Sequence, residues 1–225
     1  MVWGFGDSFT QGCFEGDFIK YPYVNIISHY LNQECTNKAR YGMAFEDINA
    51  TITKHLQYIK KGDTVIVGGT IIDRIMFPVP YEQIAEYHGT EPQGNKSLTG
   101  INYLTLDFFF DDWHIGANRM KELGYNHSKE EYARIIFDYQ HLLKEPFHDA
   151  FTRFYDDWMK HWEGYFTSVG VPFYWWYHTW WQKAPKENIG KCGHWDQTYH
   201  EEFAKLLFTF MENNSSGCFE SSTVI

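Results

Sequence analysis

The stretch that decides the fold is Met1-Val2-Trp3-Gly4-Phe5-Gly6-Asp7-Ser8-Phe9-Thr10-Gln11-Gly12. Its apolar run ends in a Gly-Asp-Ser tripeptide, and turn-forming residues follow. This pattern predicts a buried strand that delivers Ser8 to the edge of a sheet. A serine hydroxyl is a weak nucleophile unless a base lies beside it and amide donors stabilise the oxyanion. Taken alone, the tripeptide is more often a strand-to-helix turn with a capping serine, so its role depends on the partners that the chain supplies.

Strands and helices alternate along the first part of the chain. Apolar side chains recur at helical spacing over residues 21–32 and 45–59. The stretch at residues 63–69, with the apolar run Val65-Ile66-Val67 and two glycines at its end, predicts a buried strand, and residues 34–40 fit a short connection or strand. This alternation is typical of a parallel sheet covered by helices on both faces. We therefore predict an α/β fold, a three-layer α/β/α flavodoxin-like sandwich around a central parallel sheet.

The rest of the chain predicts an insertion and four further elements. Residues 77–127 are rich in proline and glycine and lack a clean period, so we interpret them as an inserted loop and helical region over the carboxyl ends of the strands. Within it, residues 103–110 fit a strand or a buried helical turn. Helices are expected at residues 128–143, 146–165 and 196–211, and a strand at residues 171–178. We expect one domain over residues 1–212 and a loosely ordered tail over residues 213–225.

The composition of the 225-residue chain excludes several classes of protein. Hydrophobic residues make up 44% of the chain, too many for a disordered protein, and the net charge of −10 argues against a nucleic-acid-binding surface. No apolar run is long enough to span a bilayer, so we expect no membrane span. Aromatic residues make up 20%, which indicates a core built of rings, with exposed rings that stack on sugars as the alternative.

Cysteine spacing and the first strand bear on the cell compartment. The four cysteines, Cys13, Cys35, Cys192 and Cys218, form no CxxC pair, so neither a zinc site nor a disulfide framework is indicated. The first strand begins at Val2 and leaves no room for a signal peptide, so we expect synthesis in the cytoplasm. A component of a virus particle, released by lysis, would reach the outside without such a peptide.

One acidic cluster bears on metal binding. Asp107, Asp111, Asp112 and His114 lie close together in the sequence, and hard cations prefer oxygen ligands. Their spacing matches no calcium-binding loop, and we interpret the cluster as a solvated acidic turn. We therefore expect no metal and no cofactor, and the sequence leaves the oligomeric state open.

A histidine near the end of the chain is the candidate base. His194 stands in a glycine-rich segment just before the terminal helix, from which its side chain can reach the carboxyl edge of the sheet. His200, six residues later, occupies a helical position and is expected to pack or to face solvent. If His194 accepts the hydroxyl proton of Ser8, the chain can carry out nucleophilic catalysis.

The chain resembles the SGNH hydrolases, also called GDSL-type esterases and lipases, in four ordered blocks. The blocks are Phe5-Gly6-Asp7-Ser8-Phe9-Thr10, Asn37-Lys38-Ala39-Arg40-Tyr41-Gly42, Thr64-Val65-Ile66-Val67-Gly68-Gly69-Thr70 and Gly193-His194. The resemblance implies Ser8 as nucleophile, His194 as base, and the backbone amides of Ser8 and Gly42 as oxyanion donors. It further implies that Asp7 shapes the turn. The matching pieces span residues 1–75 and about 165–210.

Two positions depart from the pattern of the family. The third block of the family ends in an asparagine that helps to hold the oxyanion, and the matching residue here is Thr70, whose hydroxyl donates one hydrogen bond at shorter reach. The acid of the family lies three residues before the histidine, where this chain has Lys191. Either the histidine and the serine act as a dyad, or another carboxylate orients the imidazole. Asp196 and Glu187 are the nearest carboxylates in sequence.

The resemblance implies a serine esterase that hydrolyses a small acyl ester through an acyl-enzyme on Ser8. An O-acetyl group on a carbohydrate is our first choice of substrate, since the family often acts on such esters and the chain is rich in aromatic residues. The alternative is a non-catalytic glycan-binding or structural module on the same fold, as in a virus particle, because a fold alone does not decide function. Acyl transfer to an acceptor alcohol is a third hypothesis.

Overall fold

A computed structural model of the chain describes residues 1–15, 17–40, 43–70, 74–79, 102–107, 147–177, 183–191 and 193–220. The chain forms two compact units. The first, here called the sheet unit, comprises Met1–Met43, Thr51–Thr70 and Trp158–Ile225, and the second comprises Ala44–Ala50 and Ile71–Asp157. Both units include part of the segments Phe45–His55 and Phe147–Ser168. The expectation of one domain over residues 1–212 stays a prediction.

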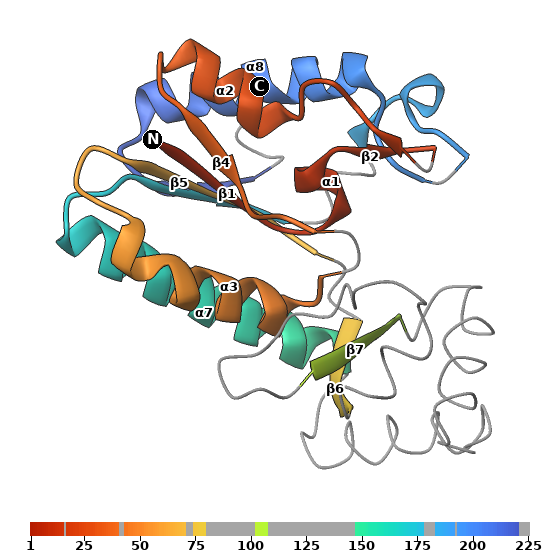
Figure 1. Ribbon diagram of the computed structural model, residues 1–225, viewed down its shortest axis with the longest axis horizontal. Coiled ribbons are helices and arrows are strands. Elements are labelled where there is room, and N and C mark those ends of the chain that lie inside the picture. Colours follow the sequence, from red (N-terminus) through yellow and green to blue (C-terminus); the bar gives the residue numbers. More distant parts are fainter. Residues whose placement is uncertain are drawn as a thin grey trace. The chain divides into compact units, whose positions relative to one another are not determined.

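A five-stranded parallel sheet forms the centre of the sheet unit (Figure 1). Its strands lie in the order β4 (Cys35–Asn37), β1 (Val2–Phe5), β5 (Thr64–Gly68), β8 (Phe173–Trp176) and β9 (Gly217–Phe219). Every neighbouring pair is parallel. Numbered along the chain, the order is 2-1-3-4-5, the flavodoxin-like arrangement. All residues of β1, β5 and β8 are buried, as expected of strands covered on both faces. The predicted α/β fold is confirmed.

Helices cover both faces of this sheet. They are α2 (Tyr23–Tyr30), α3 (Phe45–His55), α7 (Phe147–Ser168) and α8 (Gln197–Asn213). Helices α2 and α8 lie side by side on one face, and the parts of α3 and α7 that belong to the sheet unit lie on the other (Figure 1). Rings make the contacts of this second face: Phe166 of α7 stacks on Phe173 of β8 with centroids 5.3 Å apart, and His55 of α3 lies 6.0 Å from Trp3 of β1.

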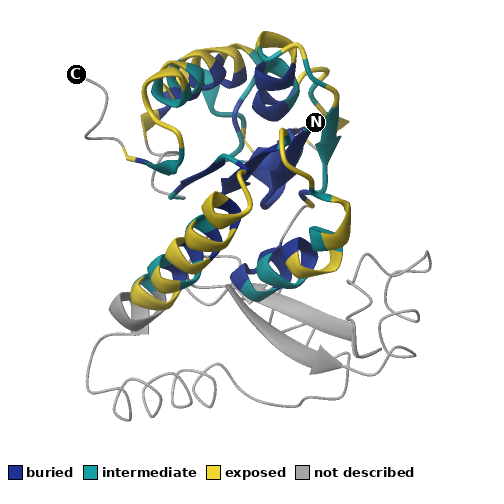
Figure 2. Ribbon diagram, turned by 90° about the vertical axis from the view of Figure 1, so that its left-hand side faces the viewer, coloured by how far each residue is buried: buried dark blue, intermediate teal, exposed yellow. Residues whose placement is uncertain are grey.

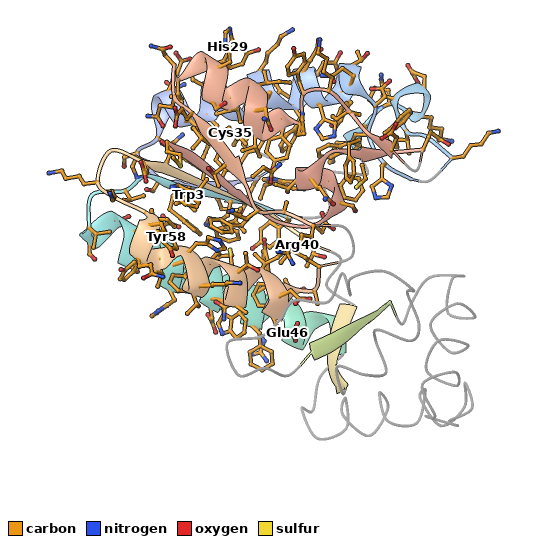
Figure 3. The ribbon with its side chains drawn as sticks, viewed as in Figure 1. Trp3, His29, Cys35, Arg40, Glu46 and Tyr58 are labelled. Atoms are coloured by element: carbon orange, nitrogen blue, oxygen red, sulfur yellow. The ribbon has the colours of Figure 1, made fainter. Side chains whose placement is uncertain are left out.

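The core is built largely of aromatic rings. Trp176 of β8 stacks on Trp195 with centroids 5.5 Å apart, and Phe203 of α8 packs edge-on against Trp176. Figure 2 shows the buried positions gathered on the strands and on the inner faces of the helices. Trp3, labelled in Figure 3, lies on the opposite face of the sheet, where its indole N–H donates to Asp63 Oδ2 at 3.0 Å. Among the described residues, the large rings that stay exposed are Phe18, Tyr21, Tyr30, Tyr58, Phe154 and Tyr165.

The second unit contains an antiparallel ribbon. Strand β6 (Arg74–Val79) pairs with β7 (Asn102–Asp107), and Arg74 stands opposite Asp107. The part of the segment at residues 103–110 that the structure describes is therefore strand, rather than helical turn. The rest of the predicted insertion at residues 77–127, with its expected place over the strand ends, and the helix expected at residues 128–143 lie outside the described residues.

Several short elements of the sheet unit were not predicted from the sequence. Helix α1 (Ser8–Gln11) follows β1, and a hairpin of β2 (Cys13–Phe14) and β3 (Asp17–Phe18) comes next. The expectation of a loose tail from residue 213 is wrong for Gly217–Phe219, which pairs with β8 as the edge strand β9. A three-residue strand in a polar segment carries no periodic signal, and it forms here because β8 offers unpaired backbone groups.

Candidate active site

The candidate nucleophile follows the carboxyl end of the first strand. Strand β1 ends at Phe5, and Ser8 is the first residue of α1. The carboxylate of Asp7 caps this helix by accepting a hydrogen bond from Phe9 N at 3.1 Å, which agrees with the expectation that Asp7 shapes the turn. Chain order reverses beside β1, since β4 lies on one side of it and β5 on the other. Ligand sites of open α/β sheets form outside the carboxyl ends of strands at such a reversal.

Two glycines make the close turn before Ser8 feasible. Gly6 has a φ of +150°, and a β-carbon there would lie 2.8 Å from the β-carbon of Thr10. A β-carbon on Gly68, at the end of β5, would lie 2.9 Å from the Trp176 ring and would overlap the hydroxyl of Thr10. The first turn of α1 therefore packs directly on the exits of β1 and β5, at distances that leave no room for a side chain.

The candidate base stands on a self-closed loop. Gly190 N–H donates to the carbonyl of His194 at 2.9 Å, and Gly193 N–H donates to the carbonyl of Gly190 at 2.9 Å. Gly193 has a φ of +78°, a left-handed conformation that favours glycine. Trp195 follows, is fully buried in the core, and anchors the loop to the sheet unit. These contacts hold the histidine just before α8.

The structure brings the two predicted side chains together. His194 Nε2 lies 2.7 Å from Ser8 Oγ, within hydrogen-bond distance, although the residues are 186 positions apart. Ser8 is fully buried and His194 is half-buried, and the ring of Phe9 lies 5.0 Å from the imidazole. A hydroxyl that shares its proton with a neighbouring imidazole nitrogen is the arrangement that activates a serine for attack on a carbonyl.

The two candidate acids occupy other places around the loop. The carboxylate of Asp196 caps α8 by accepting from Tyr199 N at 2.8 Å, and it also accepts from the amide of Asn188 at 3.0 Å. Glu187 lies exposed in the short 3-10 helix Lys186–Asn188, and Lys191 is exposed as well. Asp196 thus has a structural task at the helix terminus, and the assignment of an orienting acid stays a prediction.

The second block of the resemblance packs against the turn that carries Ser8. The side-chain amide of Asn37 donates to the carbonyl of Thr10 at 2.7 Å and accepts from Ala39 N at 3.0 Å. Arg40, labelled in Figure 3, donates its backbone N–H to the carbonyl of Gly6 at 3.1 Å. The loop after β4 is therefore fastened to both ends of the turn. Gly42, the expected oxyanion donor, lies outside the described residues.

Thr70 uses its hydroxyl in a way that the sequence did not predict. The buried Oγ1 donates to the carbonyl of Met43 at 2.7 Å. Because a threonine hydroxyl has one proton, a bond to this carbonyl leaves none for an oxyanion in this conformation. Thr70 therefore braces the residue that follows Gly42, which differs from the role of oxyanion donor that we expected.

A buried polar network under α1 was not predicted from the sequence, which indicated for His200 only a helical position that packs or faces solvent. His200 Nδ1 accepts from Tyr23 N at 3.2 Å, and the Tyr23 hydroxyl lies 2.9 Å from Trp176 Nε1 and 3.0 Å from Thr10 Oγ1. Burial, reinforced by the charge of His194, lowers the pKa of His200 from its ordinary value of 6.5 to about 3. His200 is therefore neutral at pH 7. No local pattern could reveal this bond, since its partners stand 177 residues apart.

Only part of the acidic cluster considered as a metal site belongs to the described residues. Asp107 is the last residue of β7, whereas Asp111, Asp112 and His114 lie outside the described residues. In the part of the chain that the structure describes, no helix is both long and apolar enough to cross a membrane. Comparisons with protein-family models, with curated proteins and with solved structures found no match. A functional conclusion therefore depends on the residues of the site.

Proposed function

We propose that this chain is a serine ester hydrolase of the SGNH type that acts on small acyl esters. The observation that carries the proposal is the 2.7 Å contact between Ser8 Oγ and His194 Nε2. It is supported by the position of Ser8 at the carboxyl end of β1, where the strand order reverses. Nucleophile and base within hydrogen-bond distance are the signature of covalent catalysis by a serine.

The mechanism proceeds in two stages through an acyl-enzyme. Ser8 Oγ attacks the ester carbonyl while its proton passes to His194 Nε2, and the tetrahedral intermediate collapses with release of the alcohol, which takes that proton. Water then attacks the acyl group in the same manner and regenerates Ser8. The amide N–H of Ser8, at the first position of α1, and that of Gly42 are the proposed oxyanion donors.

The use of the Thr70 hydroxyl affects the expected rate. The Thr70 hydroxyl donates its hydrogen bond to the Met43 carbonyl. The oxyanion therefore receives two donors where the family pattern has three. Loss of one such donor costs roughly 10²–10³ in rate in a well-studied protease. We therefore propose a slow esterase, whose rate of turnover lies below that of a complete SGNH site by about this factor.

An O-acetyl group on a carbohydrate is the substrate that we propose. A buried serine beside a half-buried imidazole suits a small acyl group. Phe18 and Tyr21, which come shortly after α1 in the chain, expose 61% and 50% of their surface. Exposed rings of this kind can stack on the apolar faces of sugars.

Acetate release tests the proposal with matched variants. The substrates are 4-nitrophenyl acetate and an acetylated xylo-oligosaccharide, and the variants are Ser8→Ala, His194→Gln and the control His29→Gln. His29 is an exposed histidine of α2, labelled in Figure 3. We expect kcat/KM to fall at least about 100-fold in both site variants and to stay unchanged in the control.

The same assay can also contradict the proposal. Equal hydrolysis by Ser8→Ala and by the unsubstituted protein would overturn the proposal. Retention of the acetylated oligosaccharide without acetate release would support the alternative, a non-catalytic glycan-binding module.

A further inference from the structure

The hairpin that follows α1 contains an unusual turn. Phe14 pairs with Asp17, and Glu15 follows Phe14 in the connection between the two strands. Glu15 has a φ of +51°, in the left-handed region that disfavours side-chain-bearing residues and that asparagine or glycine tolerates best. A glutamate held in this conformation suggests a compensating contact made by its side chain.

The carboxylate of Glu15 makes a contact far along the chain. Its Oε1 accepts a hydrogen bond from the backbone N–H of Lys191, 176 residues away. Hydrogen bonds to an ionised acceptor are among the stronger ones in proteins. The bond joins the hairpin next to the nucleophile with the loop that carries His194, two segments that Figure 1 shows side by side.

Gly190 is the residue that allows this approach. A β-carbon built on it would overlap the Glu15 carboxylate and would lie 2.7 Å from the ring of Phe14. Its φ is not in the left-handed region, so the contribution of glycine here is the space that it leaves for these side chains. The hairpin and the loop therefore meet in close contact at Gly190, and the exposed Glu15 bond lies beside it.

The loop transmits the position of Lys191 to the imidazole. Gly190 N–H bonds the carbonyl of His194, and Gly193 N–H bonds the carbonyl of Gly190, each at 2.9 Å. Because these bonds close the loop on itself, a shift at residues 190–191 moves the backbone that carries His194. On the other side, Gly12 N–H bonds the carbonyl of Ser8 at 2.9 Å, and β2 begins at the next residue.

We propose that Glu15 is a positioning residue, which sets the His194 imidazole against the Ser8 hydroxyl by holding the Lys191 amide. The contact uses the backbone of residue 191, so a lysine side chain is compatible with it. In the SGNH pattern the same position supplies the acid, and here a carboxylate from the hairpin steadies the loop in its place. The kinetic part of this inference rests on the proposed function, whereas the positioning itself does not.

Three variants test the inference. Glu15→Asn suits the turn but is one methylene shorter, Glu15→Gln keeps an oxygen acceptor at full length, and Asp17→Ala removes a neighbouring exposed carboxylate of the same hairpin, which accepts from Phe18 N at 2.8 Å. The first readouts are NMR measurements that need no substrate: hydrogen exchange of the Lys191 amide and the ¹⁵N shifts of the His194 ring. The second readout is the split of acetate release into kcat and KM, with the melting temperature as the check on folding.

Glu15→Asn is expected to speed exchange of the Lys191 amide at least tenfold and to move the His194 ring shifts. It is also expected to lower kcat about 10- to 100-fold at unchanged KM and melting temperature. Glu15→Gln and Asp17→Ala stay near the unsubstituted protein. Unchanged ring shifts and exchange in Glu15→Asn would overturn the inference, as would equal impairment of Glu15→Gln. Absence of ester hydrolysis in the unsubstituted protein would overturn the proposed function alone, since the NMR readouts still decide on Glu15.

Discussion

At the scale of single residues, the site consists of side chains that acquire their roles from distant partners. Ser8 follows the carboxyl end of β1 and His194 stands just before α8, and their side chains meet at 2.7 Å. Thr70 shows the same dependence on context. Its place in the third block suggested an oxyanion donor, yet its hydroxyl donates a hydrogen bond to the nearby Met43 carbonyl.

Substitution of Thr70 tests this brace. Thr70→Val keeps the shape of the side chain and removes the donor, which leaves the Met43 carbonyl without this buried hydrogen bond. We expect a loss of about 1–3 kcal/mol in the free energy of unfolding, measured by urea denaturation. Thr70→Ser keeps a hydroxyl and should lose less than Thr70→Val. Equal stability of the Val variant and the unsubstituted protein would contradict the assigned bond.

At the scale of elements, the nucleophile depends on how α1 packs against the strand exits. The hydroxyl of Thr10 lies over Gly68, and Tyr23 of α2 and Trp176 of β8 complete the contact. A residue with a side chain at the end of β5 would push α1 away from the sheet. The position of Ser8 is therefore a property of three packed elements as much as of its own turn.

Gly68→Ala is the variant that probes this packing. Since a β-carbon would overlap the Thr10 hydroxyl and would lie 2.9 Å from the Trp176 ring, we expect a loss of about 1–3 kcal/mol in unfolding free energy. The matched control is Gly164→Ala, at an exposed site of α7 where an added β-carbon would meet no atom within 4 Å beyond the neighbouring helix backbone. There the same change should add about 0.5–1 kcal/mol, because alanine favours a helix over glycine. A stable Gly68→Ala protein would refute the close approach.

The elements also show what could be predicted from the sequence and what could not. Helices α2, α3, α7 and α8 and strands β1, β5 and β8 carry long periodic or continuous apolar patterns, and their existence was predicted correctly. The strand β9 and the hairpin of β2 and β3 have two or three residues each, so pairing with neighbours, rather than local pattern, creates them. The hydrogen bond of Glu15 to Lys191 and that of His200 to Tyr23 were out of reach because each joins opposite ends of the chain.

Two aspartates near the site show how far residue type and spacing can predict a role. Asp7 and Asp196 both precede helices, and both proved to be caps. For Asp7 the resemblance implied that role. For Asp196 closeness in sequence to His194 suggested an orienting acid, although a carboxylate just before a helix is equally suited to accept from its first amides. Residue type and spacing alone do not separate these two roles.

At the scale of the whole molecule, the buried histidine links stability to pH. His200 has a pKa of about 3 in the folded chain and 6.5 as its ordinary value, so below pH 6.5 the unfolded chain binds a proton that the folded chain does not. Stability from this group is therefore complete above pH 6.5 and is lost as the pH falls toward 3. Between pH 7.5 and pH 5 the loss from His200 amounts to about 2 kcal/mol.

A substitution isolates that contribution from the other titrating groups. His200→Asn keeps an acceptor for Tyr23 N and cannot be protonated in this range. Urea denaturation at pH 7.5 and pH 5 should show a drop in unfolding free energy that is smaller in the variant by about 2 kcal/mol. Parallel drops in the two proteins would show that His200 is not kept neutral by burial.

Covalent labelling of Ser8 tests the central claim most directly. The protein is treated with a fluorophosphonate at pH 7.5, and the adduct is located by mass spectrometry of its peptides. The variants are Ser8→Ala, His194→Gln and Ser28→Ala, the last at a second buried serine, whose hydroxyl donates to the carbonyl of Asn25. We predict one adduct per chain on Ser8, loss of labelling in the first two variants and full labelling of Ser28→Ala. An unlabelled protein, or equal labelling of Ser8→Ala, would contradict the account.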